Sequence, residues 1–271
     1  MRRAAPPIVC ALVLAGSAPS ALAQPESPAY RLEAGIDVPA LVIPAVLSAS
    51  WLLGPELEPP YCAPACDPET VNAIDRPAAG LYSARWATAG DVSTVAVLAS
   101  MPIFLALAEP PGHALNDFVV VAQATLFASA TQVMTSFATS RPRPRVYGDE
   151  NPDPVDGVDA RSFFSGHTAT CLAATIATFR TLQIVRRPAL AWTALGLGVL
   201  GTGFLSVARV GSGAHFPTDV AAGAVVGFAY GILLPAVHPL SESARDGVGA
   251  RFGVHLITRR DQLGAAMAGS F

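Results

Sequence analysis

Three short segments of the chain bring together residue types that suit chemistry on a phosphate group. Their key members are Arg143, the run Ser165-Gly166-His167, and a third set of Arg209, His215 and Asp219. A guanidinium group is planar, binds two phosphate oxygens at once and keeps its charge near neutral pH. Two histidines can supply a nucleophile for phosphorus and an acid for the leaving oxygen. All 17 positively charged residues are arginines, so no lysine is available as a catalytic cation.

The first segment, Arg141-Pro142-Arg143-Pro144-Arg145, follows an apolar stretch that ends near Thr139. Its prolines stiffen the chain and stop a helix, so the guanidinium groups emerge at a fixed place beyond the helix end. Fixed donors of this kind stabilise the charge on phosphoryl oxygens. Taken alone, the cluster is equally suited to binding lipid head groups at a membrane surface.

The second segment opens the next apolar stretch. Ser165 suits the N-cap position of a helix that begins here. The free backbone N–H groups of Gly166 and His167 would then point at a bound anion, and glycine lets a phosphate come close. The alternative is an ordinary capped helix start that carries an incidental histidine, and the tripeptide alone does not decide between the two.

The third segment places His215 four residues before Asp219, with Pro217 suited to the first turn of a helix between them. At this spacing we expect the carboxylate to bond one ring nitrogen of His215 and to aim the other nitrogen outward, as in catalytic triads. The glycine-rich run 211–213 would let Arg209 converge on the same pocket. The alternative is a surface helix start with an i,i+4 charge pair.

The order of these segments, each at the same end of an apolar stretch, resembles the phosphatidic acid phosphatase type 2 / haloperoxidase superfamily over residues 90–237. That family has three signatures, Lys-x6-Arg-Pro, Pro-Ser-Gly-His and Ser-Arg-x5-His-x3-Asp. The resemblance implies a phosphohydrolase that needs no metal and no other cofactor. The acidic residues at 149–159 are therefore interpreted as a solvated loop and not as a cation site.

Position by position, the resemblance implies a role for each matching residue. His215 is the nucleophile, Asp219 orients it, and His167 is the acid that protonates the leaving group. The phosphate is held by Arg143, Ser165, the amide of Gly166, and Arg209.

Three positions depart from the family pattern. The signature lysine falls on Ser136, the proline before Ser-Gly-His is Phe164, and the serine before the second arginine is Ala208. The first change removes a cation that would contact phosphate. Arg141 or Arg145 could compensate for it.

Six apolar stretches predict an all-α fold, a bundle of about six apolar helices embedded in a membrane with the active site at one end. Each is close to the roughly 17–25 residues that cross a bilayer. The mean hydropathy is +0.45, and charged residues make up only 14% of the chain. A soluble globule whose helices are buried all round is the alternative. The stretches lie near residues 38–53, 92–108, 118–139, 168–185, 188–208 and 220–237.

We expect four parts along the chain: a signal peptide at 1–23, an N-terminal extension at 24–89, a phosphatase core at 90–238, and a polar tail at 239–271. The signal has a positive start, an apolar run and the small-x-small site Ala21-Leu22-Ala23. An uncleaved membrane anchor is the alternative. The tail contains one strand-like run at 254–258.

Export also determines how the cysteines are interpreted. In an oxidising compartment, Cys62 and Cys66 predict a small disulfide loop within the N-terminal extension. A metal pair is the rival interpretation, but no second pair of ligands accompanies it. Cys10 lies in the signal, and Cys171 is expected to be a buried packing residue.

The arginines at 180, 186 and 187 predict a cytoplasmic turn, which would place the loops at 140–165 and 209–219 outside. A cleaved signal followed by three crossings would instead place residue 140 inside. Either 38–53 does not span, or the signal is not processed, or the protein is soluble in the periplasm. We favour a bacterial inner-membrane protein whose site faces the periplasm.

The sequence therefore predicts a phosphatase that hydrolyses a phosphate monoester or diphosphate, with a membrane lipid phosphate as substrate and a phosphohistidine intermediate. A soluble periplasmic acid phosphatase is the main alternative, and a vanadate-dependent haloperoxidase is a more distant one. Replacement of the lysine by Ser136 also permits an inactive binder of lipid phosphates. The net charge of −3 argues against a nucleic-acid partner, and the sequence does not indicate an oligomeric state.

Overall fold

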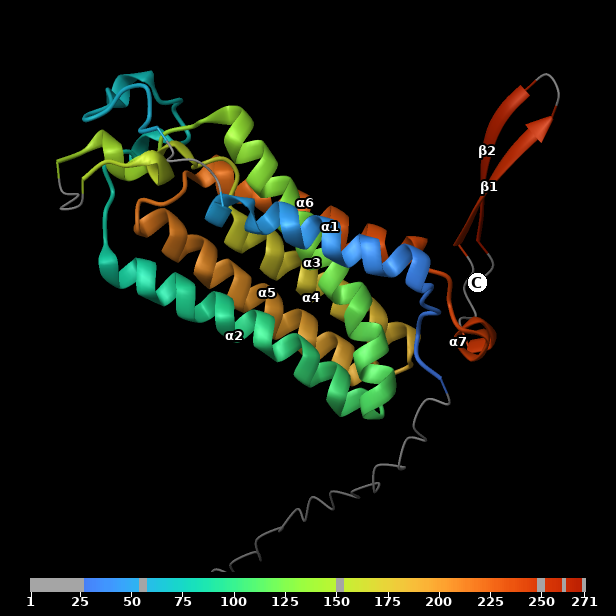
Figure 1. The fold of residues 1–271 in the computed structure, drawn as a ribbon. Helices are drawn as coiled ribbons and strands as arrows, with labels where there is room; N and C mark the ends of the chain where they lie inside the picture. Colours follow the sequence, from blue (N-terminus) through green and yellow to red (C-terminus); the bar gives the residue numbers. More distant parts are fainter. Residues whose placement is uncertain (1–26, 54–57, 150–153, 248–251, 260–261, 270–271) are drawn as a thin grey trace, which may run out of the picture.

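The computed structural model describes residues 27–53, 58–149, 154–247, 252–259 and 262–269, and the expected signal at 1–23 lies outside them. Six long helices run side by side in a bundle (Figure 1), which confirms the all-α prediction. Each helix matches one predicted apolar stretch, and all but α5 begin earlier than expected, by two residues in α4 and up to eight in α2. The six are α1 (Ala34–Leu53), α2 (Ala84–Ala108), α3 (Pro111–Thr139), α4 (Gly166–Ile184), α5 (Pro188–Gly211) and α6 (Pro217–Val237).

Short elements complete the chain. Four 3-10 helices lie in the connections: η1 (Pro68–Thr70), η2 (Arg76–Ala78), η3 (Pro144–Tyr147) and η4 (Gly157–Ala160). After the bundle come a short helix, α7 (Glu242–Gly247), and two strands, β1 (Phe252–Arg259) and β2 (Gln262–Gly269). The strands pair antiparallel, with Arg259 opposite Gln262, and β1 contains the strand-like run expected at 254–258.

Helix ends follow from local sequence. Pro111, Pro188 and Pro217 each occupy the first turn of a helix, where the N–H that proline lacks would have no partner within the helix. The hydroxyl of Ser83 accepts from the backbone of the first turn of α2 and caps it. These local signals determine where the helices begin, and therefore which residues lie at the ends of the bundle beside the connecting loops.

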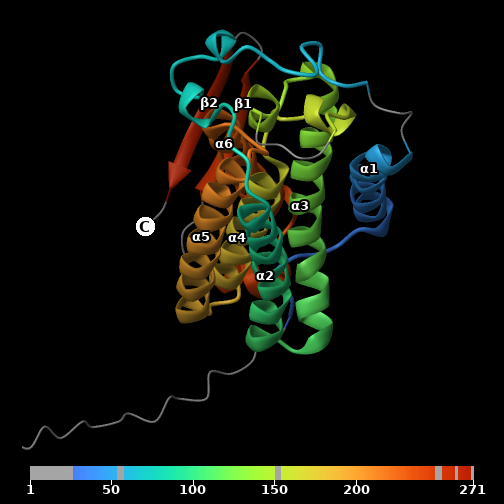
Figure 2. The same cartoon turned by 90° about the vertical axis from the view of Figure 1, so that its left-hand side faces the viewer.

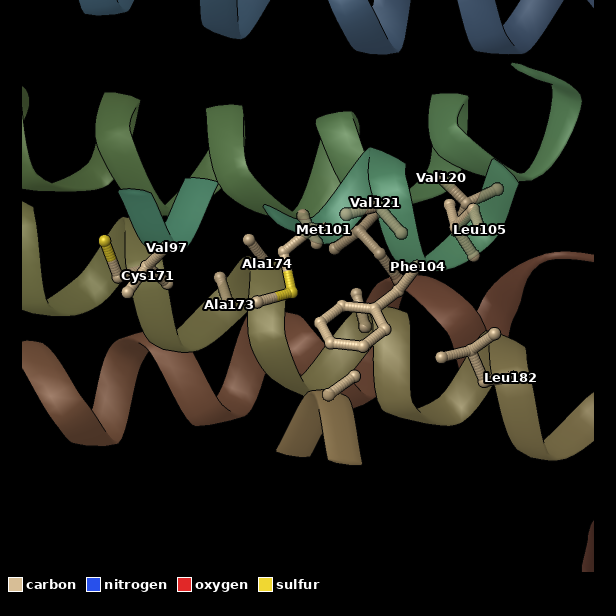
Figure 3. Close-up of a cluster of buried hydrophobic side chains, with 14 of the residues drawn as sticks. Val97, Met101, Phe104, Leu105, Val120, Val121, Cys171, Ala173, Ala174 and Leu182 are labelled. Atoms are coloured by element: carbon tan, nitrogen blue, oxygen red, sulfur yellow. The ribbon is translucent and has the colours of Figure 1, made fainter. Parts of the chain in front are cut away.

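The centre of the bundle is α4, which packs against α2, α3, α5 and α6. Two of its buried threonines donate to carbonyls one turn back in the helix, Thr175 to Cys171 over 2.7 Å and Thr181 to Ala177 over 2.9 Å. These hydroxyls are therefore satisfied within the core. Cys171 is buried, as predicted. Figure 3 shows α2, α3 and α4 meeting through Val97, Met101, Phe104, Leu105, Val120, Val121, Ala173, Ala174 and Leu182.

Small residues bring α6 directly onto the backbone of α4. A Cβ at Gly223 would lie 2.5 Å from the carbonyl oxygen of Ser165, and one at Gly227 would lie 2.3 Å from that of Ala169. Only glycine permits this approach. As a result the start of α6 lies against the start of α4, which brings two of the three predicted segments together.

Within the described residues, four helices, α2, α3, α5 and α6, are long and apolar enough to cross a membrane. Their outer faces carry large exposed apolar side chains, where a soluble globule would expose polar ones. These faces therefore favour association with a membrane. Examples are Val92, Val95 and Leu107 on α2, Trp192, Leu200 and Val207 on α5, and Val225 and Phe228 on α6.

One end of the bundle collects the predicted site segments. In Figure 1, α1, α3 and α5 end there, and α2, α4 and α6 begin there. The connections at 58–83 and 140–165 cover this end, and the predicted disulfide between Cys62 and Cys66 lies in the first of them. The expected domain boundary at 89/90 falls inside α2.

Candidate active site

A cavity of about 430 Å³ lies at the covered end of the bundle. It is lined by residues from α1, α2, α3, α4 and α5 and from the loops at 140–165 and 212–216. Five of the seven predicted site residues line it: Arg143, Gly166, His167, Arg209 and His215. The structure thus brings the three sequence segments to one place.

Arg143 precedes η3, and its backbone N–H donates to the carbonyl of Asp159 over 2.8 Å, which fixes where the side chain begins. Its buried Nε has no hydrogen-bond partner among the described residues. A buried guanidinium group without a partner is costly, because its charge has lost water and gained nothing in exchange. An anion in the cavity would remove this cost.

Arg209 lies in the last turn of α5 and is only 8% exposed. One of its terminal nitrogens donates to a carboxylate oxygen of Asp91 over 2.9 Å, while its buried Nε is also without a partner in the described chain. The same Asp91 oxygen lies 3.4 Å from Nε2 of His167. Asp91 therefore contacts both Arg209, a candidate for phosphate binding, and His167, the candidate acid.

His215 is 3% exposed, and its Nδ1 lies 2.6 Å from the backbone carbonyl of Ser162. A carbonyl can only accept, so Nδ1 carries the proton and Nε2 of the neutral ring keeps its lone pair. Burial holds the pKa of His215 well below its ordinary value, and the positive charges of Arg143 and Arg209 lower it further. The ring is therefore neutral at pH 7, and its Nε2 lone pair is not taken up by a proton.

We predicted a hydrogen bond between the Asp219 carboxylate and the ring of His215, and this prediction is wrong. Asp219 is the third residue of α6, and its carboxylate turns back to accept from the backbone N–H of Phe216 over 2.8 Å. His215 precedes the helix, so the i,i+4 geometry that would join the two does not apply. Instead Asp219 accepts from the hydroxyl of Ser162 over 2.5 Å, and Ser162 in turn holds His215 through its carbonyl.

Ser165 occupies the N-cap position of α4, as predicted, but its hydroxyl does not cap the helix. It shares a hydrogen bond of 3.0 Å with the hydroxyl of Thr168 and lies outside the cavity lining. Its backbone N–H donates to the carbonyl of Asp219 over 3.0 Å. Ser165 thus links α4 to α6, while the neighbouring Gly166 faces the cavity.

Neither arginine proposed to compensate for the missing lysine lines the cavity. Arg141 binds the carboxylate of Asp219 and, over 2.8 Å, that of Asp75. Arg145 binds Asp159 over 2.5 Å. Both charges are used to hold loops together, so they do not replace the signature lysine.

Three site residues were not identified from the sequence: Asp91, Ser162 and Arg161. Asp91 did carry a signal, because an acid at the start of a membrane-length apolar stretch usually has a functional partner. Ser162 and Arg161 carried none, since their contacts depend on how the 140–165 loop folds. Within the described ranges, no group of three or more histidine, cysteine, aspartate or glutamate side chains is placed to hold a metal.

Two arginines and two histidines meet at one end of a bundle of apolar helices, a combination that suits a phosphate group. The chain matches the family model of the PAP2 superfamily over residues 113–242, so the region that contains all three segments belongs to this superfamily. Its phosphatases act on phosphate esters, which agrees with the site. No curated protein and no solved structure matches the chain.

Proposed function

We propose that the protein is a membrane phosphatase that removes phosphate from a lipid phosphate monoester or diphosphate through a phosphohistidine at His215. One observation carries the proposal. The Nε2 atom of a neutral, buried His215 shares a cavity with Arg143 and Arg209, whose buried Nε atoms lack partners in the described chain. These are the groups that an in-line attack on phosphorus requires.

In the first step the phosphoryl oxygens bind the guanidinium groups of Arg143 and Arg209, and the amide of Gly166 at the start of α4 adds a donor. The Nε2 lone pair of His215 forms the bond to phosphorus. The bond from phosphorus to the leaving oxygen breaks, and its electron pair stays on that oxygen. The oxygen takes a proton from the imidazolium of His167. Burial and Arg209 lower the pKa of this ring, whereas Asp91 and the negative charge of the bound phosphate raise it, so the ring gains its proton when substrate binds.

In the second step a water molecule attacks the phosphohistidine in line. Neutral His167 takes a proton from this water, so that it regains its charge for the next cycle. The bond from phosphorus to Nε2 breaks and its electron pair returns to the ring of His215. Phosphate leaves, and throughout the cycle the proton stays on Nδ1 of His215, which donates it in a hydrogen bond to the carbonyl of Ser162.

A lipid substrate is supported by the shape of the cavity. Its lining follows α3 from Ser136 to Ser129, which is about 10 Å along the helix axis, and includes Ser48 of α1 and Thr94 of α2. Figure 2 shows α1 and α2 apart, with α3 between them. A head group held at the helix ends would therefore leave its apolar chain beside the apolar outer faces of the helices.

The disulfide between Cys62 and Cys66 supports a site that faces the periplasm, since it lies at the same end as the cavity. The arginine-rich turn at 180–187 lies at the opposite end, as the positive-inside rule favours. With six crossings, residue 27 would then be cytoplasmic, which is incompatible with cleavage of a signal at residue 23.

Labelling of Ala73→Cys and Ala189→Cys by an impermeant thiol reagent, in a Cys10→Ala background, tests this orientation. Labelling at position 189 in intact cells would contradict it.

The function is tested by phosphate release from purified protein in EDTA, with lipid phosphates and soluble monoesters compared at equal concentration. We expect turnover of a lipid phosphate, retention of the protein in membranes washed with carbonate, and no turnover by His215→Asn. Equal turnover of soluble esters by protein that the wash removes would instead support a soluble acid phosphatase. Near-normal phosphate release by His215→Asn would contradict the proposed mechanism.

A further inference from the structure

A third arginine, Arg161, lines the same cavity as Arg143 and Arg209. Its guanidinium carbon lies 3.4 Å from the centre of the Phe137 ring. The guanidinium group lies over the ring, and this contact uses none of its N–H donors, which stay available for an anion. In the part of the chain that the structure describes, no hydrogen bond or ion pair of this guanidinium group is found. Arg161 is a cation with unused donors.

The backbone on both sides of Arg161 is anchored. Two residues before it, the carbonyl of Asp159 accepts from the N–H of Arg143 over 2.8 Å. The next residue, Ser162, donates its hydroxyl to the buried carboxylate of Asp219 over 2.5 Å. Arg161 is therefore placed by the same contacts that place the reacting groups, and not by a freely moving loop.

Arg161 enters the cavity from a different side than the reacting groups do. It packs on Phe137 near the end of α3, whereas Arg209 lies in the last turn of α5 and His215 in the loop that follows. Arg161 therefore faces the α3 side of the cavity.

The replacement of the signature lysine leaves space in the same cavity. Ser136 is 3% exposed, lines the cavity, and donates its hydroxyl to the carbonyl of Val133 over 2.8 Å. Ser136 adds no charge to the wall, and its side chain is much shorter than the lysine of the signature. Phe137, the next residue along α3, is the residue whose ring packs against the guanidinium group of Arg161.

We propose that Arg161 binds a second phosphate of the substrate, beside the phosphoryl group that is transferred to His215. The inference rests on the proposed function and narrows its substrate class. A diphosphate, or a monoester whose head group also carries a phosphodiester, satisfies all three arginines of the cavity. A simple monoester leaves Arg161 without a partner and is bound less tightly.

Binding of soluble probes to purified full-length protein tests this without requiring turnover. Isothermal titration would compare inorganic phosphate, methylenediphosphonate and 1,3-propanediol bisphosphate with wild type, Arg161→Gln and Arg161→Lys. We expect Arg161→Gln to weaken at least one bisphosphate about tenfold and inorganic phosphate about twofold or less, with Arg161→Lys in between. Arg143→Gln should weaken all three probes. The exposed Arg85→Gln serves as the matched charge control and should change none.

The two bisphosphates distinguish the source of the second phosphate. If Arg161→Gln weakens the binding of methylenediphosphonate alone, the substrate is a diphosphate. If it weakens the binding of 1,3-propanediol bisphosphate alone, the second phosphate is a more distant phosphodiester. Equal weakening of phosphate and both bisphosphates by Arg161→Gln, or no change in any, would overturn the inference. In that case His215→Asn would still abolish phosphate release if the proposed function holds, so the two failures can be told apart.

Discussion

Asp219 and His215 act on each other through a third residue, Ser162. The Ser162 hydroxyl donates to the Asp219 carboxylate over 2.5 Å, and its carbonyl lies 2.6 Å from Nδ1 of His215. The carboxylate therefore fixes the residue that fixes the imidazole. Asp219 also caps the first turn of α6 and binds Arg141, so one carboxylate joins three parts of the site.

This arrangement predicts an effect of the Ser162 hydroxyl on catalysis. Ser162→Ala keeps the carbonyl but loses the hydrogen bond to Asp219, so we expect kcat to fall about tenfold, equivalent to ~1.4 kcal/mol. Steady-state phosphate release measures this. Ser206→Ala is the matched control, because this buried serine hydroxyl bonds Thr168 away from His215. Unchanged kcat in Ser162→Ala would contradict the indirect arrangement.

Asp91 is expected to matter most for substrates with poor leaving groups. Burial and Arg209 lower the pKa of His167, and the negative charge of Asp91 opposes this shift, so Asp91 helps the ring to hold the proton that it gives to the leaving oxygen. Asp91→Asn should slow alkyl phosphate hydrolysis about tenfold or more, but should affect p-nitrophenyl phosphate much less, since that leaving group needs little protonation. Comparing kcat for the two esters, with the exposed Glu58→Gln as control, tests this. An equal loss for both esters would show that Asp91 does not act through the acid.

Substitutions of Arg141 and Arg143 are predicted to affect different properties, the stability of the protein for Arg141 and its activity for Arg143. Arg141 holds two buried carboxylates, so Arg141→Gln should destabilise the protein by roughly 2–4 kcal/mol. Arg143 has no such partner, so Arg143→Gln should lose activity and keep or raise the thermal midpoint. Tryptophan-fluorescence melting and phosphate release on the same samples measure both. A lower thermal midpoint for Arg143→Gln than for Arg141→Gln would contradict this assignment.

The ionisation of His215 can be measured directly. Burial and neighbouring positive charge lower its pKa, because both disfavour the protonated ring. The ring should therefore stay neutral, with its proton on Nδ1, as the pH falls from 8 to 6, and Arg143→Gln should raise its pKa. NMR of protein with 15N-labelled histidine reports both properties, with His215→Asn to assign the signal. A titration midpoint at or above 6.5 in the wild type would refute this expectation.

The bundle could be predicted from the sequence because each long helix is an apolar stretch, and all of them except α1 have a proline or serine at the start. The three segments could also be predicted to meet, since each lies at the same end of such a stretch. Arg143, Gly166, His167, Arg209 and His215 line one cavity for this reason. Periodicity and caps are local properties, and a single sequence contains them.

The remaining contacts depend on how loops fold, which the sequence does not indicate. In the run of arginines at 141–145, nothing shows that only Arg143 faces the cavity while its neighbours bind Asp75 and Asp159. Arg161 lies 18 residues further on from Arg143, and Asp91 pairs with a residue 118 positions away. The error at Asp219 came from extending helical spacing back to His215, which precedes the first turn.

The central claim is that the phosphoryl group passes through Nε2 of His215. Rapid quenching of the enzyme during turnover of a 32P-labelled ester, followed by peptide mapping, tests it most directly. We predict an acid-labile, base-stable label on His215 that is absent in His215→Asn and persists longer in His167→Ala, which lacks the group that activates water. A label on another residue, or continued phosphate release by His215→Asn, would contradict the account.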